Sequence, residues 1–171
     1  MSEIEIRTLT ADDWATYKSV RLASLEDSAD SFGSTYEREA LFPDSEWQSR
    51  LEATGRANNT LPLIAERDGI PIGLSWGLIN ELGSDVAHIY QMWVSPDARG
   101  NGIGKLFLDH IAAWAIAKNC GFLELSVTIT NDAAFGLYQT SGFVPSGQTE
   151  KLREGSELKT QIMVKALRKA L

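Results

Sequence analysis

The sequence is poor in the residues that build disulfide frameworks and metal clusters. Cys120 is its single cysteine, and its two histidines, His88 and His110, lie far apart in the chain. One thiol cannot form an intramolecular disulfide, and this spacing matches no zinc-ligand pattern. We therefore expect neither a disulfide nor a metal site.

Long apolar runs and long basic runs are also missing. No stretch approaches the ~18 apolar residues that a membrane span needs, and residues 1–5 lack the basic and apolar regions of a signal peptide. The formal net charge is −7, which disfavours nucleic acid because Lys and Arg must neutralise its phosphates. These absences predict a soluble cytoplasmic protein with no membrane or nucleic-acid partner. The acidic balance is compatible with a cationic substrate such as an amine, but the simpler interpretation is that it keeps the protein soluble.

The residues that are present give the composition of an ordinary globular domain. Of 171 residues, 43% are hydrophobic and 23% are charged, and no linker or repeat divides residues 1–171, so we expect a single domain. Alternating apolar residues predict strands over about 4–7, 61–67, 70–79, 86–94, 122–128, 143–147 and 158–165; helical spacing predicts helices over about 11–25, 34–41, 43–55, 103–119 and 131–140. A helix separates the fourth and fifth strands of this series, so these two strands should lie parallel.

Four local signals refine these boundaries. Asp68-Gly69 predicts a tight hairpin between two strands. Gly121 is expected to be the left-handed C-cap of the long helix that precedes it. Ser45 and Gln48 have the spacing of a capping box at a helix start. Residues 148–157 are expected to form a polar loop.

A glycine-rich loop joins the fourth strand to the long helix. Gly100, Gly102 and Gly104 leave backbone N–H groups uncovered by side chains, and the helix N-terminus adds its positive dipole, so the segment suits a phosphate or pyrophosphate. A Rossmann fingerprint needs glycines at the first, third and sixth positions, and a P-loop needs Ser or Thr after Gly-Lys. Leu106 follows Lys105 here, and the glycine spacing differs, so both nucleotide motifs are excluded.

The pattern Arg99-x-x-Gly102-x-Gly104 is similar to the acyl-CoA-binding motif of the GNAT superfamily of N-acetyltransferases. The resemblance includes the series Asn131-x-x-Ala134-x-x-x-Tyr138-x-x-x-Gly142-Phe143 and covers the chain from Leu61 onward, while the residues before it match loosely. It implies an α+β fold, an α/β/α sandwich. Such a fold has a mixed, mostly antiparallel sheet of about seven strands, with a splayed parallel pair in the centre and helices on both faces.

The resemblance also implies acetyl-CoA as co-substrate and an amine as acceptor, without a metal. In the family, the glycine loop binds the pyrophosphate, and the end of the preceding strand pairs with the pantetheine amides like an added strand. Dimers are common in the family, so a homodimer is an open alternative to a monomer. The coenzyme-binding residues expected on this basis are Met92, Trp93, Val94, Arg99, Gly100, Asn101, Gly102, Ile103, Gly104, Lys105, Asn131 and Tyr138.

Acetyl transfer to an amine needs a proton donor for the leaving thiolate and a neutral attacking amine. The resemblance makes Tyr138 the general acid, because the tyrosine at this position in the family lies near the coenzyme sulfur. Some relatives carry a glutamate base at the position of Ser126, and a serine cannot serve as that base. His88 is the candidate base in this chain. Further candidates on the acceptor side are Glu37, Glu39 and Glu81.

These features predict an enzyme that transfers an acetyl group from acetyl-CoA to a primary amine of a small molecule or peptide, by direct attack in a ternary complex. A GNAT-like domain that binds acyl-CoA and regulates a partner without turnover is the alternative. The acceptor stays open among polyamines, aminoglycosides, amino acids and protein N-termini. Its site is expected to include Phe32, Tyr36, Trp76 and Tyr90.

Overall fold

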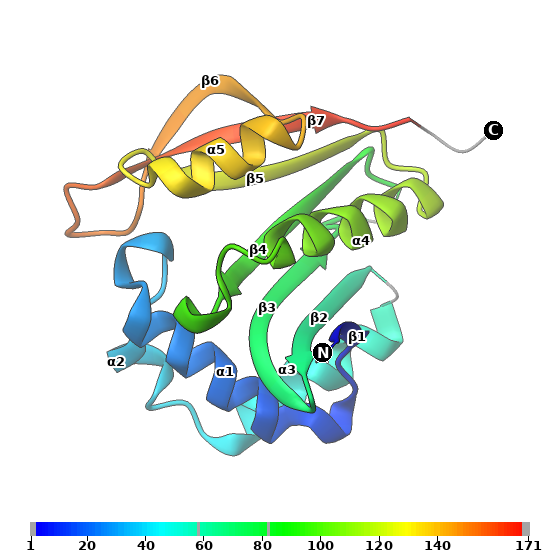
Figure 1. Ribbon diagram of the computed structural model, residues 1–171, viewed down its shortest axis with the longest axis vertical. Coiled ribbons are helices and arrows are strands. Elements are labelled where there is room, and N and C mark those ends of the chain that lie inside the picture. Colours follow the sequence, from blue (N-terminus) through cyan, green and yellow to red (C-terminus); the bar gives the residue numbers. More distant parts are fainter. Residues whose placement is uncertain (1–2, 58, 82, 169–171) are drawn as a thin grey trace.

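The computed structural model describes residues 3–57, 59–81 and 83–168 and shows a single seven-stranded sheet in the order β1-β2-β3-β4-β5-β7-β6 (Figure 1). β4 and β5 are parallel, and all other neighbouring strands are antiparallel. This confirms the expected mixed, mostly antiparallel sheet. The strands are β1 (Ile4–Thr8), β2 (Thr60–Arg67), β3 (Ile70–Leu78), β4 (Val86–Val94), β5 (Phe122–Thr128), β6 (Val144–Lys151) and β7 (Lys159–Ala166).

Helices cover both faces of the sheet, as expected for a three-layer sandwich (Figure 1). α4 and α5 pack on one face, and α1 and α3 pack on the other with α2 beside them. None of the helices in the described part of the chain combines the length and apolarity that a membrane crossing would need. The helices are α1 (Trp14–Asp27), α2 (Tyr36–Glu39), α3 (Asp44–Ala57), α4 (Ile103–Ala117) and α5 (Asp132–Thr140).

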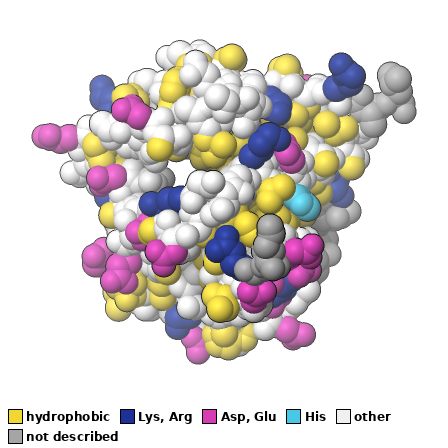
Figure 2. All heavy atoms as spheres, viewed as in Figure 1, with side chains coloured by type: hydrophobic (Ala, Val, Ile, Leu, Met, Phe, Trp, Pro, Cys, Tyr) yellow, Lys and Arg dark blue, Asp and Glu magenta, His cyan; other side chains and the backbone are white. Residues whose placement is uncertain are grey.

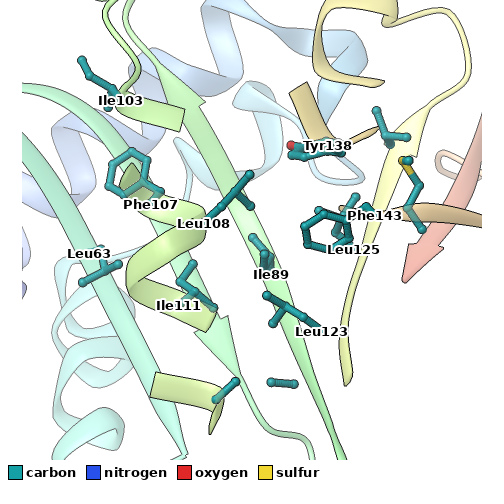
Figure 3. Close-up of a cluster of buried hydrophobic side chains, with 14 of the residues drawn as sticks. Leu63, Ile89, Ile103, Phe107, Leu108, Ile111, Leu123, Leu125, Tyr138 and Phe143 are labelled. Atoms are coloured by element: carbon teal, nitrogen blue, oxygen red, sulfur yellow. The ribbon is translucent and has the colours of Figure 1, made fainter. Parts of the chain in front are cut away.

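Each face of the sheet has its own hydrophobic core, because alternate residues of a strand point to opposite sides. In β2, Leu63 belongs to the core under α4 and α5, and Ile64 belongs to the core under α1 and α3. Figure 3 shows the first core, in which Phe107 and Ile111 of α4 lie among side chains of the strands. The second core is rich in aromatic residues and lies under the N-terminal helices.

The centre of the sheet opens where its two parallel strands separate. β4 and β5 pair only at Val86–Phe122, Ala87–Leu123 and His88–Glu124, although both strands continue beyond these residues. The remainder of β4 therefore presents an edge that β5 does not cover. This geometry confirms the expected splayed parallel pair.

β4 also contains a bulge on its other side. Leu74 of β3 faces Trp93 and Trp76 faces Tyr90, so two residue steps on β3 oppose three on β4. Gln91 absorbs the extra residue with a positive φ of 59°. The bulge lies beside the point where β4 leaves β5, which is where the candidate site is found.

The predicted Asp68-Gly69 hairpin is confirmed by the backbone, which also shows how α5 begins and ends. The hairpin at Asp68-Gly69 has positive φ at both residues, 54° and 77°, as a type I′ turn requires. Asn131 caps α5 by accepting a hydrogen bond from the Ala134 N–H. Gly142, with φ of 98°, follows the end of α5.

Three local predictions are wrong. The left-handed residue after α4 is Asn119, with φ of 64°, and not Gly121, whose N–H instead bonds to Asp85. α3 begins at Asp44, so Ser45 lies inside the first turn and cannot form the capping box. β6 continues to Lys151, into the expected loop over 148–157, because backbone pairing with β7 holds an exposed edge strand that has no apolar alternation.

Candidate functional site

A cavity of about 430 Å³ lies between the end of β4, the glycine loop and α5. It gathers segments that are far apart in the sequence, since it also includes Ser28, Ser31 and Phe32 from the chain after α1. The residues expected to bind the coenzyme are brought together here, with Asn101 as the exception. Those that line the cavity are Met92, Trp93, Val94, Arg99, Gly100, Gly102, Ile103, Gly104, Lys105, Asn131 and Tyr138.

The glycine loop has the geometry of an anion-binding site. Gly100 and Gly102 have φ of 80° and 77°, in the left-handed region that other residues adopt only with strain, and a Cβ atom at either position would meet no atom within 4 Å. Within the described part of the chain, none of the N–H groups of residues 100–105 donates a hydrogen bond to the protein. These donors surround the positive end of α4, so a phosphate group would complete them.

Gly104 has a different function from the two glycines before it. A Cβ atom at this position would lie 2.7 Å from Cδ2 of Leu137, on α5. The missing side chain therefore allows the start of α4 to approach α5 closely. Asn101, which lies outside the cavity lining, holds the loop from within by donating to the carbonyl oxygens of Ala98 and Arg99 at 3.0 and 3.4 Å.

Asp27, the last residue of α1, connects the N-terminal helices to this cavity. Its Oδ2 accepts hydrogen bonds from Nε1 of Trp93 at 3.0 Å and from Nη2 of Arg99 at 2.8 Å. The hydrogen bonds from Trp93, Ser28 and Arg99 lower the pKa of Asp27 below its ordinary value. Sequence reasoning missed Asp27, because an acid at the end of a helix has no distinctive signal.

Tyr138 lies in α5 on the wall of the same cavity, and only 8% of its surface is exposed. Burial raises the pKa of its phenol to about 12. The ring packs edge-on against Phe143 with centroids 5.9 Å apart, and in the described residues its hydroxyl makes no hydrogen bond. Tyr138 is therefore a protonated donor at neutral pH whose hydroxyl is not committed to another protein group.

A second cavity, of about 720 Å³, adjoins the first, and Ser31 and Phe32 line both. It is bounded by α1, the chain before α2, the bulge of β4 and the strands β6 and β7. Trp76 and Tyr90 also line it, so three of the four residues expected at the acceptor site lie together. Tyr36 is 37% exposed and lines neither cavity.

A polar network that the sequence did not predict forms one wall of this second cavity. Tyr17 donates to Oε1 of Gln91 at 2.9 Å, and Arg50 donates to the Tyr17 hydroxyl at 3.3 Å. Arg50 and Arg21 both bind Glu39. Tyr17, Arg21, Arg50 and Gln91 line the cavity, whereas Glu39 lies behind the two arginines. One sequence feature could have indicated this network: Arg21 is a charged residue at helical spacing from Tyr17 and Leu25, on the buried side of α1.

Glu39 is held as a counter-ion, although it was considered as a base. Burial by itself would raise the pKa of this carboxyl, but hydrogen bonds and charges from Arg21 and Arg50 lower it below its ordinary value. Its side chain is 3% exposed and accepts from Nε and Nη2 of Arg21 at 3.1 and 3.0 Å. Glu37 and Glu81 are exposed and line neither cavity.

His88 and Ser126 differ in how they relate to the second cavity. Ser126 lines it, in the place where some relatives carry a glutamate. His88 lines neither cavity, and its ring stacks on that of Tyr90 with centroids 6.0 Å apart. Glu150, on exposed β6, is the carboxylate found among the described lining residues, and no sequence pattern distinguishes it from other surface acids.

The splayed sheet, the glycine loop at the start of α4 and the two adjoining cavities agree with the fold and the site arrangement that the sequence resemblance implies. Residues 22–143 match the Acetyltransferase (GNAT) family, and the chain belongs to this family. Its relatives include an uncharacterized N-acetyltransferase of Methanocaldococcus jannaschii, 31% identical over 85 residues that cover 47% of this chain and 37% of the relative. The chain therefore matches well under half the length of that relative.

Solved structures extend the similarity to almost the whole chain. A GNAT-family acetyltransferase from Streptococcus pneumoniae superposes with a TM-score of 0.83 at 24% identity, covering 97% of this chain and 100% of the other. The yncA protein of Salmonella typhimurium, solved with its cofactor acetyl-CoA, superposes with a TM-score of 0.81 at 16% identity, covering 99% of this chain and 97% of the other. At these identities the superpositions establish the fold.

Proposed function

We propose that this protein is an N-acetyltransferase that moves the acetyl group of acetyl-CoA directly to a primary amine. The observation that carries this proposal is that two cavities of different character meet at Ser31 and Phe32. One is bounded by unbonded N–H groups and the uncovered edge of β4, and the other by aromatic and polar side chains. A thioester in the first and an amine in the second would meet at their junction.

The first cavity fits coenzyme A at two levels. The free N–H groups of residues 100–105 and the N-terminus of α4 would bind the pyrophosphate. The segment of β4 after His88, which β5 does not cover, would pair with the amides of the pantetheine arm. The coenzyme supplies the activated acetyl group, and the chain supplies its position.

Tyr138 is our proposed general acid. When the amine has attacked the thioester carbonyl and the carbon–sulfur bond breaks, the sulfur needs a proton. The Tyr138 hydroxyl, with its pKa raised to about 12, holds that proton at neutral pH. Its lack of another partner in the described residues leaves it available to the sulfur.

The attacking amine must be neutral, and the second cavity favours that form. Arg21 and Arg50 line it, and like charge disfavours an ammonium group in the same space. We therefore propose that the amine loses its proton to solvent on entry. His88, one ring removed from the cavity behind Tyr90, remains a candidate for relaying that proton through water.

The test is release of the coenzyme A thiol from acetyl-CoA in the presence of an amine panel, with mass spectrometry of the product. The panel should contain polyamines, aminoglycosides, amino acids and peptides. We expect thiol release that depends on one class of amine, with one acetyl group gained by the amine. Tight binding of acetyl-CoA without turnover on any amine would instead support a regulatory acyl-CoA-binding module.

A further inference from the structure

The second cavity, where we propose that the amine binds, is lined by several polar groups that have no hydrogen-bond partner among the described residues. Nη1 of Arg21, Nε1 of Trp76 and Oγ1 of Thr60 are buried polar atoms that find no hydrogen-bond partner among the described residues, and all three side chains line this cavity. A buried donor without an acceptor costs about 1–3 kcal/mol, and more when it is charged. Three such groups on one cavity wall offer hydrogen bonds to the acceptor atoms of a ligand.

The electric charge of the cavity wall that contains Arg21 and Arg50 also favours a ligand that accepts hydrogen bonds. The side chains of Arg21 and Arg50 are 6% and 25% exposed, and among the described residues Glu39 is the buried carboxylate that binds both. Glu46 also bonds Arg50, but it is 45% exposed and therefore screened by water. The buried cluster has two cations and one anion, and so carries an excess positive charge. At the exposed rim, Glu150 and Lys151 offset each other.

The acidity of the whole chain does not extend into the cavity. The formal net charge of the chain is −7, and Figure 2 shows acidic side chains at several separate places on one face of the molecule. Among the described residues, the acid that lines the cavity is Glu150, on the exposed strand β6. The net charge of the whole chain is compatible with a cationic substrate, but the positive charge of Arg21 and Arg50 in this cavity opposes a polyamine.

Resting on the proposed acetyltransferase function, we propose that the acceptor is a small amine that also carries a carboxylate, bound by Arg21 and Arg50 in the cavity beneath the β4 bulge. A carboxylate has two oxygens that accept hydrogen bonds from guanidinium groups in pairs. It would balance the excess charge and satisfy Nη1 of Arg21. A volume of about 720 Å³ suits a molecule of amino-acid size together with the approach path for its amine.

The experiment compares matched acceptors that differ only in this group. We choose α- and ω-amino acids, each beside its own carboxamide, with spermidine as a polycation, and measure kcat/KM in the thiol-release assay. A charge-assisted hydrogen bond to arginine predicts that the preferred acid exceeds its carboxamide by tenfold or more. Equal or higher kcat/KM for the carboxamide or for spermidine would overturn the proposal.

Arg50→Gln is the informative variant. Arg21→Gln would leave Glu39 buried without its bidentate partner and endanger folding, whereas Arg50 is partly exposed. Both members of an acid–carboxamide pair meet the same altered cavity, so their kcat/KM ratio isolates the carboxylate. We expect the ratio to fall about tenfold in Arg50→Gln and to stay unchanged in Lys118→Gln, which removes a charge after α4 and lines neither cavity. An unchanged ratio in Arg50→Gln would refute the assignment.

A binding measurement separates this inference from the function on which it rests. Calorimetry with the same acid and carboxamide, in the presence of coenzyme A, requires no turnover. Binding of the acid but not the carboxamide, without acetylation of any amine, would reject the enzyme and retain the carboxylate site. Acetylation of amines with no preference for acids would retain the enzyme and reject the site.

Discussion

Replacing Tyr138 with phenylalanine removes one oxygen atom from the wall of the first cavity, where we propose that acetyl-CoA binds. The hydroxyl makes no hydrogen bond within the described residues, so its loss leaves no protein group unsatisfied. The ring, which packs on Phe143 and is 8% exposed, is retained. Folding stability and acetyl-CoA affinity should therefore change little, by under about 1 kcal/mol each.

Turnover should fall much further. A positioned general acid contributes roughly 10²- to 10⁴-fold, which corresponds to about 3–5 kcal/mol of transition-state stabilisation. The assay is thiol release at saturating acetyl-CoA, with the dissociation constant of acetyl-CoA measured separately by calorimetry. Tyr36→Phe is the matched control, because Tyr36 lines neither cavity.

The pH dependence gives a second, independent check on this acid. Burial raises the pKa of Tyr138 from 10.0 to about 12, so the protonated form is present below that value and is lost only as pH rises through it. A tyrosine with the ordinary pKa near 10 would already be half ionised at pH 10. We expect kcat to show no loss assignable to Tyr138 up to pH 10. A kcat that falls by half near pH 10 in the wild type but not in Tyr138→Phe, or equal losses of turnover and acetyl-CoA affinity in the variant, would refute the reasoning.

The remaining predictions concern the glycine loop and the buried ion pairs. Gly102→Val should weaken acetyl-CoA binding, measured by calorimetry, tenfold or more, because the side chain would crowd the phosphates. Gly83→Val is the control, since Gly83 also has a positive φ but lies outside both cavities. If both variants bind acetyl-CoA with the same affinity, the glycine loop is not part of the site. Glu39→Gln should lower the free energy of unfolding, measured in urea, by about 3–5 kcal/mol, because it leaves two arginines without their buried counter-ion. The control Glu46→Gln should lower it by under about 0.5 kcal/mol. Similar losses of stability in the two variants would contradict the assignment of Glu39 as the buried counter-ion. In the folded protein the pKa of Glu39 lies below its ordinary value of 4.5. The carboxylate therefore contributes stability above pH 4.5, and this contribution is lost as the pH falls through the folded pKa. Glu39→Gln should flatten the acid side of the plot of stability against pH, and an unchanged acid side would contradict this role of Glu39.

The sequence could predict those parts of the fold that depend on local chemistry. Asp68-Gly69 predicted the hairpin because the turn needs positive φ, and the glycine loop predicted an anion site because its glycines leave backbone N–H groups uncovered. The predicted strand over 143–147 ended before β6 does, because backbone hydrogen bonds hold this exposed edge strand and leave no pattern in its side chains. Asn119 was missed because asparagine tolerates the left-handed region without being required there.

The acceptor side was largely beyond sequence reasoning. The network from Gln91 through Tyr17 to Arg50 joins a strand and two helices that are far apart in the chain. The β4 bulge that carries Gln91 arises from register, which no local motif specifies. Phe32, Trp76 and Tyr90 line one cavity together, but the charge of that cavity depends on residues that only the three-dimensional structure brings together.

The central claim is that thioester and amine meet directly where the two cavities join. Covalent catalysis would instead need a nucleophile to carry the acetyl group, and the single cysteine, Cys120, is fully buried and lines neither cavity. The most direct test is a matrix of initial rates in which acetyl-CoA and the amine are varied together. Reciprocal plots that intersect would show that both substrates are bound before acetyl transfer, as this account predicts. Parallel lines, the pattern of a ping-pong reaction through an acetylated enzyme, would contradict it.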